Sequence, residues 1–228
     1  MAAACAQAER DVNAVTLLAV SKTFGPDAVA DALAAGQTAF GENYIQEGVE
    51  KILALQDLLP GAGIEWHCIG PLQSNKTRQV ATHFDWVQSV DRLKIAQRLS
   101  EQRPVDRAPL QVCLQVNVDG GANKSGVTPA ELSGLAIAVA QLPRLRLRGL
   151  MCIPEPADSF EAQRAVFLQA RALFDELNAR GLGLDTLSMG MSDDLDAAIA
   201  AGSTMVRVGR AVFGSRAAPP ERPDRSSI

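Results

Sequence analysis

The chain has 228 residues, of which 47% are hydrophobic, and its 22 basic and 26 acidic side chains give a formal net charge of −4. This composition suits a globular protein, and the charge gives no electrostatic footprint for nucleic acid or for an acidic membrane surface. No apolar stretch approaches the roughly 18 residues that a transmembrane helix requires. Residues 1–14 also lack the basic and apolar regions of a signal peptide.

Apolar segments typical of β-strands alternate with helical patterns from one end of the chain to the other. The strands are predicted at residues 15–20, 38–42, 65–70, 84–90, 110–118, 145–151, 186–190 and 204–209. The helices are predicted at residues 26–35, 44–59, 74–82, 92–102, 129–141, 160–180 and 193–201. Each strand–helix unit takes roughly 25–30 residues, the length that one βα repeat requires.

Eight strands, most of them followed by a helix, predict a closed (β/α)8 TIM barrel over residues 1–215. A doubly wound open sheet is the alternative, although no G-x-G-x-x-G motif follows the first strand. Residues 216–228 are rich in proline, serine and charge, and we expect them to form a disordered tail.

The four cysteines indicate the redox environment. They are Cys5, Cys68, Cys113 and Cys152, and no two of them form a C-x-x-C pair. The chain has only two histidines, so a metal site would need ligands from distant segments. We therefore expect no metal, and cysteines that act as small buried side chains in a reducing cytoplasm.

The active sites of such barrels lie at the carboxyl ends of the strands, and phosphate often binds to the loops after strands seven and eight. The loop after strand seven reads SMGMSDD, from Ser188 to Asp194, and Gly209 ends strand eight. Small hydroxyls and free backbone amides there favour an anion site. The alternative is a simple capped turn, with Ser192 as the helix N-cap and Asp193 and Asp194 in the first turn.

Two positively charged side chains occupy unusual positions in or just after the predicted strands. Arg207 shares one face of the last strand with Met205, and within so apolar a strand it must have a partner or point into the site. Lys22 follows the first strand, where burial would favour the neutral, nucleophilic amine. Taken alone, Lys22 is better explained by a surface salt bridge at the barrel rim. A phosphate site, an arginine and an amine together describe pyridoxal 5′-phosphate (PLP).

Several sequence motifs, in a fixed order along the chain, indicate a relationship to a known family. The sequence resembles the YggS/PROSC family of pyridoxal-phosphate homeostasis proteins over residues 15–215. The matching segments are LLAVSKTF (17–24), FGENYIQEGVEK (40–51), EWHCIGPLQSNK (65–76), QVNVDGGANKSG (115–126), LRLRGLMCIP (145–154), LSMGMSDDLDAAIAAGSTMVRVG (187–209) and AVFG (211–214). The family in turn resembles the barrel domain of alanine racemase, its N-terminal domain, and that of bacterial-type ornithine decarboxylase.

The resemblance implies ten cofactor-binding residues. They are Lys22, Asn43, His67, Asn117, Ser188, Gly190, Ser192, Arg207, Gly209 and Arg210. Lys22 would form the internal aldimine and Arg207 would face the pyridine nitrogen. The 188–192 segment would bind the phosphate, together with Gly209 and the backbone of Arg210. The remaining three would line the pocket.

The chain departs from the family pattern at three places. Pro71 stands where many relatives have histidine, and Arg210 replaces a small residue, often threonine, so one hydroxyl contact to phosphate is lost. The leading helix is also short, which puts the first cap of the barrel in doubt. Lys124, in a glycine-rich loop after the fifth strand, is either a second amine at the barrel mouth or a solvated loop residue.

The resemblance favours a monomeric, non-catalytic carrier that holds PLP and delivers it to apoenzymes. The alternative is a PLP-dependent amino-acid racemase or decarboxylase, and weak racemase-like activity stays open. Related racemases take a tyrosine base from a further β-domain, for which we expect no room here, and the only tyrosine is Tyr44. Arg207 beside the ring nitrogen would disfavour its protonation and weaken the electron sink. Direct contact with apoenzymes is a third, weaker hypothesis.

Overall fold

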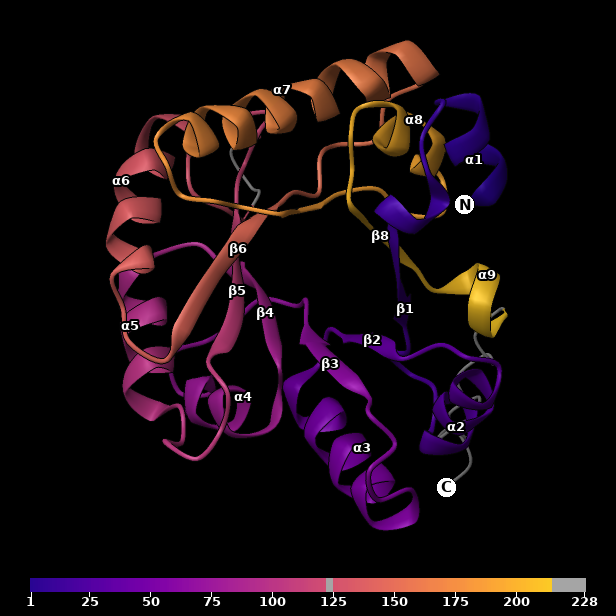
Figure 1. Ribbon diagram of the computed structural model, residues 1–228, viewed down its shortest axis with the longest axis vertical. Helices are drawn as coiled ribbons and strands as arrows, with labels where there is room; N and C mark the ends of the chain where they lie inside the picture. Colours follow the sequence, from indigo (N-terminus) through magenta and orange to yellow (C-terminus); the bar gives the residue numbers. More distant parts are fainter. Residues whose placement is uncertain (122–124, 215–228) are drawn as a thin grey trace, which may run out of the picture.

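In the computed structural model, which describes residues 1–121 and 125–214, eight parallel strands close into a barrel in the order β1 to β8 (Figure 1). The strands are β1 (Thr16–Val20), β2 (Ala39–Glu42), β3 (Glu65–Cys68), β4 (Trp86–Val90), β5 (Leu110–Gln115), β6 (Leu145–Met151), β7 (Thr186–Ser188) and β8 (Met205–Val208). The predicted barrel is confirmed. The open-sheet alternative is wrong, because β1 pairs with both β2 and β8.

Helices surround the strands on the outside of the barrel (Figure 1). Those that follow β1 to β7 are α2 (Pro26–Ala34), α3 (Ile45–Leu58), α4 (Thr77–His83), α5 (Leu93–Gln102), α6 (Pro129–Ala140), α7 (Phe160–Ala179) and α8 (Leu195–Ala200). The described residues also form α1 (Ala2–Gln7), the 3₁₀ helix η1 (Val12–Ala14) and a short α9 (Arg210–Phe213) after β8.

Side chains of the strands form two apolar layers. The layer inside the barrel includes a cluster of Leu18, Val20, Ala39, Ile69 and Met205 and a second cluster of Trp86, Cys113 and Met151. A larger cluster, which includes Phe40 and Phe84, lies between the strands and the helices. Burial on both faces explains why the strands are continuous apolar runs in the sequence.

The N-terminal segment packs beside α8. Ala4 and Cys5 of α1 belong to the same apolar cluster as Ile199 of α8. Arg10 donates from Nη1 to the carbonyl oxygens of Ile199 and Ser203, at 2.9 and 2.6 Å. The short leading helix therefore still covers this part of the barrel.

The turn between β7 and α8 differs from the prediction. Ser192 is not the N-cap of the helix; Asp194 holds that position and α8 begins at Leu195. The carboxylate of Asp194 accepts a hydrogen bond from the Met191 N–H at 2.6 Å, which closes a turn over residues 191–194 before the helix begins. Ser192 and Asp193 are therefore left in the loop that borders the barrel mouth.

Within residues 1–121 and 125–214, no helix combines the length and apolar character needed to cross a lipid bilayer. That same part of the chain brings no three His, Cys, Asp or Glu side chains close enough to hold a metal ion. The four cysteines are buried and form no disulfide. The predicted tail at 216–228 lies outside the described residues.

Candidate functional site

A cavity of about 380 Å³ opens at the carboxyl end of the barrel, the end at which barrels of this type carry their sites. Its size is within the usual range for small-molecule sites. Its wall is formed by Val20, Lys22, Phe24, Asn43, Ile69, Ile153, Met191, Ser192, Asp193, Arg207, Gly209, Arg210 and Gly214. These residues lie at the carboxyl ends of β1 and β8 or after β1, β2, β3, β6, β7 and β8, so the cavity is assembled from most of the strand ends.

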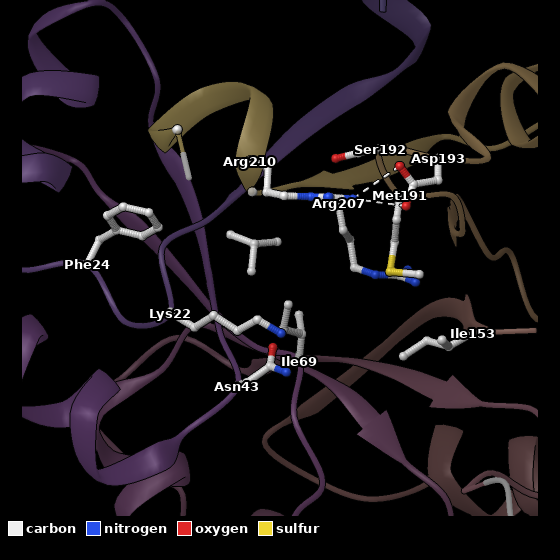
Figure 2. A pocket seen from close by; sticks show the side chains of 13 residues that line it. Lys22, Phe24, Asn43, Ile69, Ile153, Met191, Ser192, Asp193, Arg207 and Arg210 are labelled. Atoms are coloured by element: carbon white, nitrogen blue, oxygen red, sulfur yellow. Dashed lines mark hydrogen bonds and ion pairs between the residues drawn. The ribbon is translucent and has the colours of Figure 1, made fainter. Parts of the chain in front are cut away.

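Lys22 reaches the cavity because of the strand alternation. Leu18 and Val20 point into the barrel, so Lys22 takes the next inward position and Ser21 the outward one. Figure 2 shows the Lys22 side chain extended toward Ile69 and Asn43, on the β1–β3 side of the cavity. The amine is therefore presented to the cavity.

Arg207 lies buried at the inner side of the cavity. Its Nη1 donates to the carbonyl oxygen and to Oγ of Ser188, both at 2.8 Å, and its Nη2 donates to the carbonyl oxygen of Cys152 at 2.9 Å. Burial lowers the pKa of the Arg207 guanidinium, yet an arginine stays charged in a protein. These three bonds fix a positive charge in one orientation against the cavity.

A chain of hydrogen bonds continues below Arg207 through the barrel interior. Ser188 Oγ donates to Gln88 Oε1 at 2.6 Å, Gln88 Nε2 lies 2.9 Å from His67 Nδ1, and His67 Nε2 lies 2.8 Å from Glu65 Oε1. Burial lowers the pKa of His67, and its hydrogen bond lowers the pKa of Glu65. A neutral His67 that accepts at Nδ1 and donates from Nε2 satisfies every bond of this chain.

The opposite wall is built from the loop after β7 and the start of α9. Gly190 has φ +96°, and a Cβ added there would lie 2.4 Å from the Ala198 Cβ, so the turn requires glycine. Arg210 pairs with Asp193 at 3.0 Å across this side, as Figure 2 shows. Their side chains are 69% and 85% exposed. This wall is therefore open to solvent and held by an exposed ion pair.

The structure brings six of the ten predicted residues onto the cavity wall. They are Lys22, Asn43, Ser192, Arg207, Gly209 and Arg210. His67 and Asn117 are not among the residues that form the cavity wall, so their predicted place in the cofactor pocket stays a prediction. His67 is buried inside the barrel, and Asn117 donates from Nδ2 to the Gly121 carbonyl at 2.9 Å within its own loop.

The other two predicted residues support the wall from behind. Ser188 is buried and bonded to Arg207, and Gly190 shapes the turn and accepts the Arg207 N–H at 3.0 Å through its carbonyl oxygen. Lys124 lies outside the described residues.

Sequence reasoning missed the residues that hold the site. Gln88 links Ser188 to His67, and Lys51 of α3 lies buried beneath the loop that carries Lys22. A signal for Lys51 was present: it falls three residues after Gly48 and four before Leu55, on the buried face of α3. A lysine on an apolar helix face calls for a buried partner.

The fold and the cavity define a class: a (β/α)8 barrel that presents an amine and a fixed guanidinium at the carboxyl ends of its strands. The chain belongs to the family of the alanine racemase N-terminal domain, whose model matches residues 1–217. Among its relatives is the pyridoxal phosphate homeostasis protein of Pseudomonas aeruginosa, 61% identical over 209 residues, which are 92% of this chain and 88% of the relative. The protein of that name from Escherichia coli is 55% identical over 216 residues, 95% of this chain and 92% of the relative. The resemblance seen in the motifs is therefore confirmed.

Solved structures agree with this relationship. PipY of Synechococcus elongatus with PLP bound is 38% identical, with a TM-score of 0.80 over 92% of this chain and 97% of that one. The same protein without PLP gives 40% identity and a TM-score of 0.82 over the same shares of both chains. Alanine racemase of Corynebacterium glutamicum, 19% identical with a TM-score of 0.67 over 99% of this chain and 62% of that one, shares the fold alone.

The cavity residues fit a phosphorylated aldehyde with a flat aromatic ring. The Lys22 amine can meet the aldehyde on one wall, and Ser192, Gly209 and Arg210 offer hydroxyl, backbone and guanidinium donors for a phosphate on the other. Apolar surface between the two walls comes from Ile69 and Val20, among others. The distribution of donors and apolar surface thus matches the three parts of PLP.

Proposed function

We propose that this protein binds PLP through Lys22 and takes part in intracellular PLP homeostasis by holding the cofactor and passing it to PLP-requiring apoenzymes. One observation carries the proposal: the Lys22 amine enters a cavity whose far wall is made of phosphate-type donors. The relatives named for this function, at 61% and 55% identity, support it.

The bound cofactor supplies an aldehyde and an electron-poor pyridine ring. Lys22 contributes the nucleophile: its nitrogen bonds to the aldehyde carbon, and the carbonyl oxygen leaves as water. Ser192, Gly209 and Arg210 bind the phosphate. Asn43 lies beside the Lys22 side chain in Figure 2, where its amide can orient the polar edge of the ring. Covalent and ionic contacts at opposite ends hold the ligand in one orientation.

Features of the cavity favour a carrier over an enzyme. The fixed charge of Arg207 disfavours a proton on the ring nitrogen that it faces, and an unprotonated ring is a weaker electron sink. Racemisation also needs acid–base groups on both faces of the substrate carbon. Tyr44, at the N-cap of α3, is 58% exposed and is not among the residues of the cavity wall. We therefore propose binding and release with little or no turnover.

Absorbance spectroscopy tests the binding. The wild-type protein mixed with PLP should gain a visible band that Lys22→Ala lacks, because only a lysine amine bonded to the aldehyde extends the conjugation of the ring. A wild-type protein that gains no band would contradict the cofactor assignment.

Two further assays test the carrier role. Incubation of the loaded protein with a PLP-requiring apoenzyme should restore that enzyme's activity faster than an equal concentration of protein loaded and then reduced with borohydride. Racemisation of alanine or serine that disappears in Lys22→Ala would contradict the carrier role. We also propose a cytoplasmic monomer, which light scattering should report near the chain mass of 24.2 kDa.

A further inference from the structure

We propose that Lys51, with Glu42 and Glu47, is the positioning device for the Lys22 amine, an inference that rests on the proposed covalent role of Lys22. These three side chains lie outside the strand ring, between β2 and α3. They do not touch the cavity, so they act through the backbone on either side of Lys22.

Lys51 holds the peptide group that precedes Lys22. Its Nζ donates to the Ser21 carbonyl oxygen at 2.8 Å, and it is paired with Glu42 Oε1 at 2.6 Å and with Glu47 Oε1 at 3.3 Å. The Lys51 and Glu42 side chains are both buried. One ammonium therefore joins the end of β1, the end of β2 and the first turns of α3.

Glu47 holds the peptide group that follows Lys22. Its Oε1 accepts the Thr23 N–H at 2.5 Å. Thr23 has φ +70°, a left-handed conformation that is strained for a residue other than glycine and persists only where its surroundings hold it. Since both peptide groups around the Lys22 Cα are tied to α3, the direction of its side chain is set by this helix.

Glu42 connects the Lys51 ammonium to the side chain of Ser21. Its Oε1 accepts from Ser21 Oγ at 2.5 Å as well as from Lys51. Desolvation raises the pKa of Glu42, against the opposing effects of Lys51 and Ser21. Gly48 lets α3 approach closely, because a Cβ there would lie 2.7 Å from Phe84 and 3.2 Å from the Glu42 Cβ. The helix and the strand end are thus packed at a fixed distance.

Energetics favour a positioning role over simple stabilisation. A buried ion pair gains little over an apolar pair of similar volume, because desolvation offsets the attraction. An apolar pair in place of Lys51 and Glu42, however, could not bond the carbonyl or the hydroxyl of Ser21. The charged groups fix the backbone conformation on both sides of Lys22. This matters because a small misplacement of a reacting group can slow its reaction by about 100-fold.

The experiment compares Glu47→Gln and Lys51→Met with Glu50→Gln, a matched control on the exposed face of α3. Three quantities are measured: the rate at which Lys22 bonds to PLP, the rate at which acetic anhydride acetylates Lys22 relative to exposed Lys94 in ligand-free protein, and the affinity for pyridoxine 5′-phosphate. The last ligand has an alcohol in place of the aldehyde and cannot bond to the amine.

We expect Glu47→Gln to slow bonding to PLP about tenfold, and Lys51→Met about 100-fold, with pyridoxine 5′-phosphate affinity within twofold of wild type. The acetylation ratio should change in both variants and stay constant in Glu50→Gln. Glu47 is 32% exposed, so Glu47→Gln decides the matter if Lys51→Met does not fold.

Unchanged Lys22 reactivity in Glu47→Gln would overturn the inference. An equal loss of pyridoxine 5′-phosphate affinity would also overturn it, since the network would then support the whole cavity and not Lys22. If wild-type protein does not bond PLP, the proposed function fails, while the acetylation ratio still tests the positioning of Lys22 separately.

Discussion

The two walls of the cavity are built in opposite ways. Behind Lys22, the buried ammonium of Lys51 and the partly exposed carboxylate of Glu47, both on α3, bond the backbone on either side of this residue. Around Arg210 and Asp193, the polar groups are exposed and bonded mainly to each other. If the proposed function holds, the end of the site that bonds to the aldehyde is set before a ligand arrives. The end proposed to bind phosphate can then exchange its partners when an anion enters.

The largest expected difference between the walls is in stability. Glu42→Leu leaves the Lys51 ammonium buried without its main counter-charge, which should lower the free energy of unfolding by about 3 kcal/mol. Asp193→Leu breaks an exposed pair and should change it by less than about 0.5 kcal/mol. Urea unfolding of both variants measures the two losses of unfolding free energy. Equal losses would contradict the difference between the walls.

A smaller effect should appear in ligand affinity at the exposed wall. Arg210→Ala removes a guanidinium that can turn from Asp193 to a phosphate, so PLP affinity should fall about tenfold. The affinity for pyridoxal, which has no phosphate, should stay the same. Fluorescence titration of both ligands measures this, and a parallel loss for pyridoxal would show that Arg210 does not act on the phosphate.

The pH dependence of the free energy of unfolding compares these walls with the buried hydrogen-bond chain below Arg207, which includes His67. Burial lowers the pKa of His67 from its ordinary value of 6.5, so in acid the unfolded chain takes up a proton that the folded protein excludes. The stability that neutral His67 supplies is therefore present above about pH 6.5 and lost as pH falls below it. His67→Gln should reduce this dependence in urea unfolding. The half-buried site of His83 makes His83→Gln the control, which should retain most of it.

The smallest effect is expected from Asp193→Asn. This change frees Arg210 from its exposed partner, and PLP affinity should rise about twofold, the scale of a surface ion pair. The gain should vanish at high salt, where wild type and variant become equal because the pair is screened. A gain that persists in high salt would point to a structural change in the loop.

The strand and helix periodicities were sufficient to predict the barrel, because each βα unit is local in sequence. The place of Lys22 at the barrel mouth followed from its position directly after the first strand, whereas its role was implied only by the family resemblance. His67 could not be placed, since its burial depends on a partner on another strand, Gln88, and on Glu65 below it. The start of α8 was missed because Asp194 and Ser192 are both good N-caps, and only the turn geometry selects between them.

Hydrogen exchange of backbone amides, with and without PLP, tests the contrast between the walls most directly. We expect the Thr23 amide, which donates to Glu47, to be protected in the free protein and to change little when PLP is added. Amides of residues 191–193 and 209–211 should exchange quickly in the free protein and slow down when PLP binds. Rapid exchange at Thr23 in the free protein, or no change at 191–193 and 209–211 on saturation with PLP, would contradict it.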